Sequence, residues 1–436
     1  MTVVRAASVR VIAWAVLWTV VVPTVAVALA VQYDPELSPL DEVAHLDYLD
    51  RATRWEYPKM GDEVSVEVAT LAGCRSFETR QEPTCEERGD YVGQPEDFVW
   101  DGYSYEAQHP PPYYWVSAAL TRVTGLGPAD NLITTGRLTG AFWLSAGCAA
   151  LYLALRRLDV GHIASGLVCG LLVAGPGVLM ATSKITNDAT TILAGSLAVL
   201  GFTFLRERPS IPRLAAVSGI VVTIVALKPV NIIAVGAIAL VLVVELHRTV
   251  GLRRAVGYAG ALAGVGAFTV LAWREIVAAQ ASVDPTVVID AVVSFKQKSD
   301  GPPIGQFVFH SSRLLEAYND GSFVTGRGAA AMAVLGTVTL VSGSTALVLT
   351  GRWSTPARIG FAALAVFVAA GPLFNLQFWL DYGLRGGPAA RYGLPLLPLL
   401  AVSVAGLADT SRRGRIGLAA VTVLLLVSSG FGVVLN

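Results

Sequence analysis

Apolar and polar residues follow one another along this chain in long blocks. Eleven blocks rich in Ala, Val, Leu and Gly approach the roughly 20 residues that an α-helix needs to cross a bilayer. They lie near residues 11–31, 133–155, 163–182, 188–205, 213–228, 230–246, 255–273, 329–350, 357–378, 392–410 and 416–434. The pattern predicts an all-α polytopic membrane protein with eleven transmembrane helices.

The first of these blocks and one shorter apolar segment differ from ordinary membrane spans. The first follows Arg5 and Arg10 and ends in Ala28-Leu29-Ala30, which also suits a cleaved signal peptide. The apolar core of a signal peptide is usually about 7–15 residues long, shorter than this block, so we interpret it as an uncleaved first helix. The apolar segment 111–125 contains Arg122 and is too short to cross, so we expect an interfacial helix there.

Composition supports the membrane interpretation. Hydrophobic residues make up 54% of the chain and charged residues only 15%, with a mean hydropathy of +0.58, whereas soluble domains carry about 25% charged residues. These values exclude a soluble globular protein. The 32 basic residues balance the 32 acidic ones, so no basic field attracts nucleic acid, and we expect no nucleic-acid partner.

Basic clusters predict the orientation, because Lys and Arg in short loops favour the cytoplasmic side. With the N-terminus inside, alternation puts every such cluster inside: Arg156/Arg157, Arg206/Arg208/Arg213, Arg248/Arg253/Arg254, Arg352/Arg358 and Arg412/Arg413/Arg415. The acidic loop 33–110, a second loop 275–328 and three polar turns then lie outside. Because the Ala-, Val- and Gly-rich composition is typical of a high-GC bacterium, we expect a multi-pass protein of a bacterial plasma membrane with an extracytoplasmic active site.

The domain organisation is expected to be simple. No self-similar repeat of 20–50 residues and no low-complexity linker divides the chain, which favours one integral membrane domain over residues 1–436. Cys74 and Cys85 lie in the exported acidic loop, where a disulfide is permitted, and we expect them to be bridged.

Asp41, Glu42 and His45 follow the first predicted helix, where Ser38 or Pro39 can open a short helix. Helical spacing puts Asp41 and His45 on one face. Two adjacent carboxylates repel one another, and one of them is then suited to take a proton from a hydroxyl group. Acidic residues also suit the first turn of any helix, because its dipole favours negative charge. From the sequence alone both interpretations stay open.

Further polar residues mark the predicted outer ends of later helices. His109 precedes a Pro-Pro-Pro-Tyr-Tyr-Trp segment that suits the headgroup level, and its side chain suits a phosphate or a metal. The outer turns contain Lys184, Asn187, Asp188, Lys228, Arg385, Arg391 and Tyr392. One basic residue at a helix end usually only reaches the headgroups. Three basic turns on one outer face instead predict a bound anion, most naturally a phosphate.

Together these motifs resemble a known family. The matching residues are Asp41-Glu42-x-x-His45, His109-Pro110-Pro111, Asn187-Asp188, Lys228-Pro229 and Arg391-Tyr392-x-x-Pro395. They resemble the membrane family of unknown function 2142, which in turn is similar to the GT-C superfamily of polyprenyl-phosphate-sugar-dependent glycosyltransferases. The resemblance extends from about residue 11 to residue 434, and it departs from the family at Ala390, where a Gly is expected before the Arg-Tyr pair.

The resemblance implies a GT-C fold, a polyprenyl-phosphate sugar donor and an acidic base in the first external loop. On this chain it implies Asp41 as the base, supported by Glu42 and His45, although the base could also be Glu42. It implies Lys184, Lys228 and Arg391 on the phosphate side. We count His109, Asn187, Asp188, Arg385 and Tyr392 as further substrate-binding candidates.

The predicted reaction moves a sugar, by resemblance arabinofuranose, to a hydroxyl group of a glycan, glycolipid or protein, with inversion. The alternative is a lipid or glycan transporter or a polymer ligase of the cell envelope. Transporters often carry charges near the membrane midplane, whereas the charges here lie at one surface, which favours the enzyme. Carboxylates of the acidic loop suit Mg²⁺ or Mn²⁺, but no spacing specifies a metal, so no cofactor is assigned.

Overall fold

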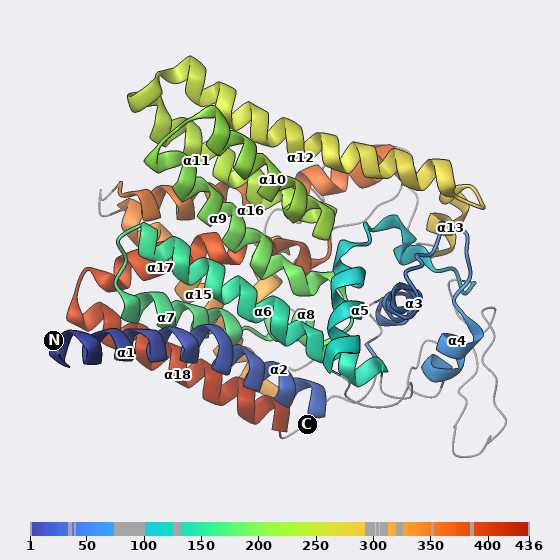
Figure 1. Ribbon diagram of the computed structural model, residues 1–436, viewed down its shortest axis with the longest axis horizontal. Coiled ribbons are helices and arrows are strands. Elements are labelled where there is room, and N and C mark those ends of the chain that lie inside the picture. Colours follow the sequence, from blue (N-terminus) through green and yellow to red (C-terminus); the bar gives the residue numbers. More distant parts are fainter. Residues whose placement is uncertain are drawn as a thin grey trace.

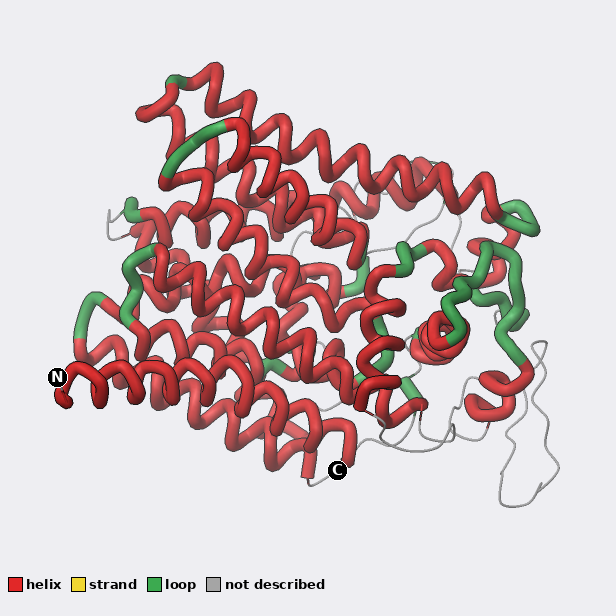
Figure 2. Tube along the Cα trace, viewed as in Figure 1, coloured by secondary structure: helices red, strands yellow, loops and turns green. Residues whose placement is uncertain are grey.

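The computed structural model shows a bundle of helices that run along one common direction, with a group of shorter helices at one end (Figure 1). It describes residues 2–33, 37–38, 41–73, 101–124, 132–292, 301, 305, 313–319, 326–349, 353–383 and 388–434. Within these ranges the chain is helical with connecting loops and no β-strand, as the secondary-structure colouring of Figure 2 shows. The predicted all-α fold class is confirmed.

The first predicted span is one continuous helix with a local irregularity. Helix α1 (Thr2–Val16) passes through a π-helical turn, η1 (Leu17–Val21), into α2 (Val22–Tyr33). The other bundle helices are α6 (Leu132–Arg157), α7 (His162–Val173), α8 (Pro176–Ser183), α9 (Thr191–Glu207), α10 (Ile211–Leu227), α11 (Ile232–Val250), α12 (Leu252–Gln280), α15 (Gly326–Leu349), α16 (Thr355–Tyr382), α17 (Leu397–Asp409) and α18 (Arg412–Val434).

Each of the eleven predicted segments contains helix, but not all of them meet the criteria for a span. Among the described residues, eight helices are long and apolar enough to cross a membrane. The pair α7 and α8, which bends by 70°, adds a ninth if the two helices form one broken span. The bend occurs at Gly175-Pro176, where proline has no amide hydrogen to continue the helix. Helix α10 has only 17 residues, and α18 is not among the candidate spans. The multi-pass architecture is therefore confirmed, whereas the count of eleven is not.

Ion pairs connect the predicted cytoplasmic loops, which lie together at one end of the bundle. Glu207, at the end of α9, pairs with Arg157 at 2.5 Å and with Arg213 at 3.7 Å. Glu245, near the end of α11, pairs with Arg206 and Arg358. These contacts join the ends of α6, α9 and α11 to the starts of α10 and α16. The N-terminus lies at this same end in Figure 1, as alternation of the spans requires.

The opposite end carries the helices of the two long loops, α3 (Glu42–Thr53), α4 (Val66–Gly73), α5 (Pro112–Thr124) and α13 (Pro285–Val292) (Figure 1). Buried residues of α3 and α5 form a second hydrophobic cluster, which reaches the bundle through Trp143 and Ile185. A helix thus occupies the segment for which an interfacial helix was predicted; one side of α5 buries Tyr113 and Tyr114, while Val123 is 85% exposed. Cys74, Cys85 and their predicted disulfide lie outside the described residues.

Short 3₁₀ turns begin several bundle helices at this end. They are η5 (Asn187–Thr190) before α9, η6 (Pro229–Asn231) before α11 and η8 (Ala390–Leu396) before α17, together with η3 (Tyr105–Gln108) before α5 and η7 (Arg313–Tyr318) before α15. A 3₁₀ turn packs its residues more tightly than an α-helix does. Polar residues in or beside η3, η5, η6 and η8 meet at this end.

Candidate active site

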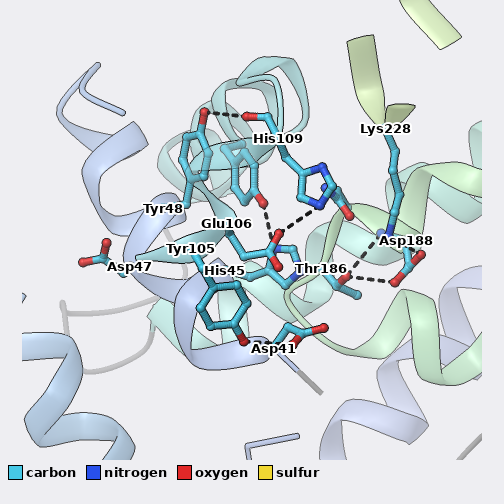
Figure 3. Close-up of polar contacts among 12 residues, drawn as sticks. Asp41, His45, Asp47, Tyr48, Tyr105, Glu106, His109, Thr186, Asp188 and Lys228 are labelled. Carbon is cyan, nitrogen blue, oxygen red and sulfur yellow. Dashed lines mark hydrogen bonds and ion pairs between the residues drawn. The ribbon is translucent and has the colours of Figure 1, made fainter. Parts of the chain in front are cut away.

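Asp41 is the N-cap residue of α3 and lies at the lower edge of the group of polar residues shown in Figure 3. Its backbone is left-handed, with φ of 68°, a conformation that Asp tolerates better than most residues. Its Oδ1 accepts a hydrogen bond from the Tyr105 hydroxyl at 2.8 Å, and its Oδ2 pairs with Arg391 Nη2 at 2.5 Å. The Asp41 side chain is 29% exposed. The carboxylate is therefore held by two groups but is still open to a substrate.

Glu42 is in a different environment although it is the next residue. Its carboxylate is fully buried and accepts two hydrogen bonds from Arg137, both at 2.8 Å. It also accepts from the backbone amides of Ser38 at 2.7 Å and Ile185 at 2.9 Å. Glu42 thus joins the start of α3 to α6 and to the turn after α8. All four hydrogen bonds come from other parts of the protein. The Glu42 carboxylate is therefore arranged to hold these segments together.

A chain of ion pairs runs from Asp41 into the bundle. Arg391, in η8, pairs with Asp41 and places its Nε 3.2 Å from Asp188 Oδ2. Asp188, in η5, pairs through Oδ1 with Lys228 Nζ at 2.5 Å. The Asp188 and Lys228 side chains are almost completely buried. The structure therefore brings together residues 41, 188, 228 and 391, which are remote in the sequence and were predicted to share one outer face.

A small pocket adjoins this chain of charges. Its volume is about 20 Å³, and its lining combines Lys184, Asp188 and Arg391 with Ser38, Thr186 and the α8 residues Gly177, Met180 and Ala181. Two cations thus face the same space as an apolar helix surface. The volume holds about one water molecule, and it is the chemistry of the lining that matches an anionic headgroup attached to a hydrocarbon chain.

A second polar group, the imidazole cluster, consists of His45, Glu106, His109 and Tyr114. Glu106 Oε2 lies 3.2 Å from His109 Nε2 and 3.4 Å from His45 Nδ1, and the Tyr114 hydroxyl lies 2.6 Å from His45 Nδ1. Burial lowers the pKa values of His45 and His109, and the positive charge of Lys228 lowers them further. Burial and the negative charge of Asp41 raise the pKa of Glu106.

The remaining predicted residues have varied surroundings. The Asn187 side chain is buried, and neither its nitrogen nor its oxygen has a hydrogen-bond partner among the described residues. Tyr392 packs against Phe374, and the Lys228 ammonium lies 5.6 Å from the centre of its ring. Arg385 lies outside the described residues. Within the described ranges, no group of three or more His, Cys, Asp or Glu residues is arranged to hold a metal ion.

Sequence reasoning did not identify Tyr105 and Glu106. Both lie in η3, near the end of the long acidic loop, four and three residues before His109. The nearby His109 and proline residues marked the segment, but many acidic and aromatic residues precede them in the loop. Only the fold shows that Tyr105 reaches Asp41 and that Glu106 lies between two histidines.

Comparisons with known proteins identify the fold. No protein-family model and no curated protein sequence matches the chain. Among solved structures, it is similar to ArnT from Cupriavidus metallidurans bound to undecaprenyl phosphate, with a TM-score of 0.53 and 17% sequence identity. The match covers 94% of this chain and 62% of ArnT, so the chain spans less than two thirds of that protein. The chain has a GT-C fold, as the motif resemblance predicts.

Two weaker similarities were also found. The archaeal oligosaccharyltransferase AglB from Archaeoglobus fulgidus, in complex with an inhibitory peptide and a dolichol-phosphate, matches with a TM-score of 0.48 and 11% identity, over 95% of this chain and 55% of AglB. The arabinosyltransferase EmbB from Mycobacterium smegmatis matches with a TM-score of 0.36 and 15% identity, over 95% of this chain and 41% of EmbB.

Proposed function

We propose that the chain is a membrane glycosyltransferase that moves a sugar from a polyprenyl-phosphate donor to a hydroxyl group of an acceptor. The observation that carries this proposal is the pocket in which Lys184 and Arg391 face an apolar surface of α8, beside the partly exposed carboxylate of Asp41. A lipid phosphate and a base for the acceptor would then be neighbours. The similar fold of ArnT, which was solved with undecaprenyl phosphate, agrees with this choice of donor.

In the proposed reaction, Asp41 is the general base. Each carboxylate oxygen has more than one acceptor position, so Asp41 can keep Tyr105 and Arg391 and still receive the proton of the acceptor hydroxyl. The hydroxyl oxygen attacks the anomeric carbon, and the bond from that carbon to the phosphate oxygen breaks. The configuration at the anomeric carbon is inverted, because there is a single displacement.

The leaving phosphate needs positive charge that is already in position. Arg391 offers a planar fork for two phosphate oxygens, and Lys184 and Lys228 add point charges. Asp188 keeps Arg391 and Lys228 in place, since it contacts both. Glu42 is a positioning residue in this scheme because Arg137 and two backbone amides occupy its oxygens.

We place this site on the extracytoplasmic face of a bacterial plasma membrane, with the N-terminus in the cytoplasm. The basic residues clustered at the opposite end of the bundle support this orientation. We retain one integral domain, arabinofuranose as the first sugar to test, and a glycan, glycolipid or protein as the acceptor. Mg²⁺ or Mn²⁺ stays a prediction, which activity measured with and without a chelator tests.

The role of Asp41 is tested by replacing it with Asn, which keeps the shape but cannot take the proton. We expect Asp41→Asn to lower turnover by about 10²–10⁴-fold, the usual contribution of general acid–base catalysis, without loss of expression. Asp50→Asn on the same helix is the control, because Asp50 pairs only with the partly exposed Arg54 among the ion pairs of the described residues. Near-normal turnover of Asp41→Asn would remove Asp41 from this role.

A further inference from the structure

Glu106 is a buried carboxyl group that the proposed reaction does not use. Its side chain is 4% exposed and lies between the rings of His45 and His109 (Figure 3). The two approaches to Oε2, at 3.2 and 3.4 Å, are short enough for ionic contact, but no donor among the described residues makes a well-aligned hydrogen bond to this oxygen. His109 Nδ1 is also buried without a hydrogen-bond partner there. The imidazole cluster therefore has positions at which a proton can be added.

The net charge of the pocket and the neighbouring ion pairs gives a reason for adding a proton at these positions. The pocket and the chain of ion pairs contain three cations, Lys184, Lys228 and Arg391, and two carboxylates, Asp41 and Asp188. An ionised Glu106 is a third carboxylate, and with neutral histidines the net charge is then zero. If Glu106 is protonated, the net charge is +1. That value balances the single negative charge of a phosphodiester, which is the form of the phosphate in a polyprenyl-phosphate sugar.

Glu106 is also electrostatically connected to the residues that would contact the phosphate. The charges of Asp41, Lys228, Arg391 and Asp188 all act on it. The other titratable groups around it are two histidines and four tyrosines: His45 and Tyr48 on α3, His109 and Tyr114 at the start of α5, Tyr105 beside it and Tyr392 on η8. Helices α12 and α13 also contact η3, but Arg274 and Glu275 near the end of α12, Asp284 in the loop between the two helices and Asp290 of α13 are exposed.

We propose that Glu106, together with His45 and His109, takes up a proton from solvent when a lipid phosphate binds, so that Glu106 is a charge-compensating residue of the donor site. This inference rests on the proposed function, and it adds a residue and a proton to donor binding. An anion close to a carboxyl group favours the protonated form of that group. By linkage, donor binding must then tighten as the pH falls.

The test uses a prenyl methyl phosphodiester, which carries one negative charge and does not titrate near neutral pH. Calorimetric binding to the purified full chain is measured in buffers of different ionisation enthalpy between about pH 6 and pH 8.5. For the wild type we expect net proton uptake approaching one proton per ligand, and affinity that rises up to about tenfold per unit of falling pH. For Glu106→Gln, which is neutral at every pH, we expect little uptake and little pH dependence, with affinity retained at neutral pH.

Glu56→Gln is the matched control, since Glu56 lies on the same loop and is largely exposed. It should behave as the wild type does. Phosphodiester binding without proton uptake at any pH would overturn this inference and leave the proposed function intact, as would uptake that is unchanged in Glu106→Gln. If the phosphodiester does not bind to folded protein at all, the proposed donor site itself is wrong.

Discussion

Replacing Glu42 with Gln separates a structural carboxylate from a catalytic one. In the structure each Glu42 oxygen accepts one hydrogen bond from Arg137 and one from a backbone amide. The Gln side chain replaces one of these oxygens by an NH₂ group, which then faces two other donors. Arg137 is only 2% exposed and would be left as a buried charge without its counter-ion.

The expected cost can be estimated from these contacts. Breaking a buried ion pair by changing one partner typically costs about 3–5 kcal/mol. The double variant Glu42→Gln/Arg137→Met removes both charges and should regain most of this energy. It keeps one mismatched backbone amide, which costs about 1–3 kcal/mol. We therefore expect the apparent melting temperature in detergent to be lowest for Glu42→Gln, intermediate for the double variant and highest for the wild type.

Activity then distinguishes the two carboxylates. Turnover is measured below all three melting temperatures, with Arg137→Met alone as the fourth member of the cycle. If Asp41 is the base, the folded double variant should retain substantial turnover, because the Asp41 carboxylate is unchanged. A double variant that is folded and stable but inactive would refute this reasoning and assign the base role to Glu42.

Two further predictions follow from the same contacts. Arg391→Lys keeps the charge but loses the planar fork, so we expect the donor KM to rise about 10- to 100-fold, as for loss of a hydrogen bond to a charged group. Lys has a single nitrogen for the two contacts with Asp41 and Asp188, so the melting temperature should also fall, and saturation is measured below it. Indistinguishable donor saturation curves would exclude the phosphate contact. Burial lowers the pKa values of His45 and His109, so the unfolded chain binds protons near pH 6.5 that the folded chain does not. Their contribution to stability is therefore present above about pH 6.5 and is lost as the pH falls. The double variant His45→Gln/His109→Gln should show a smaller drop in melting temperature between pH 8 and pH 5.5 than the wild type. A drop of the same size in both proteins would contradict the lowered pKa values of the two histidines.

The fold was largely predictable because its signals are local. Apolar blocks of the right length mark the bundle helices, because a chain segment in lipid must satisfy its backbone hydrogen bonds internally and therefore forms a helix. Basic clusters mark one end of these helices. The number of spans was less predictable. The segment 163–182 is one apolar block in the sequence, yet the helix is bent by 70° at Gly175-Pro176. Helix α10 has only 17 residues, because it ends at Leu227, just before Lys228.

The site was predictable only in part. Basic residues in short outer turns are unusual, because Lys and Arg favour the cytoplasmic side. For this reason Lys228, Arg391 and, in the turn of Lys184, Asp188 were identified from the sequence. The different environments of Asp41 and Glu42 depend on Arg137, a residue 95 positions away from Glu42, and no local pattern encodes that contact. Glu106 was missed for the same reason, because its importance comes from two histidines that converge only in the folded chain.

The most direct test of the central claim is incubation of the purified protein in lipid with a panel of polyprenyl-phosphate sugars and candidate acceptors. We expect that at least one donor is consumed, that free polyprenyl phosphate and a glycosylated acceptor appear in equal amounts, and that the product has the inverted anomeric configuration. Folded protein that binds these lipids and moves them across proteoliposome membranes, but releases no polyprenyl phosphate from any donor, would contradict the account and identify a transporter instead.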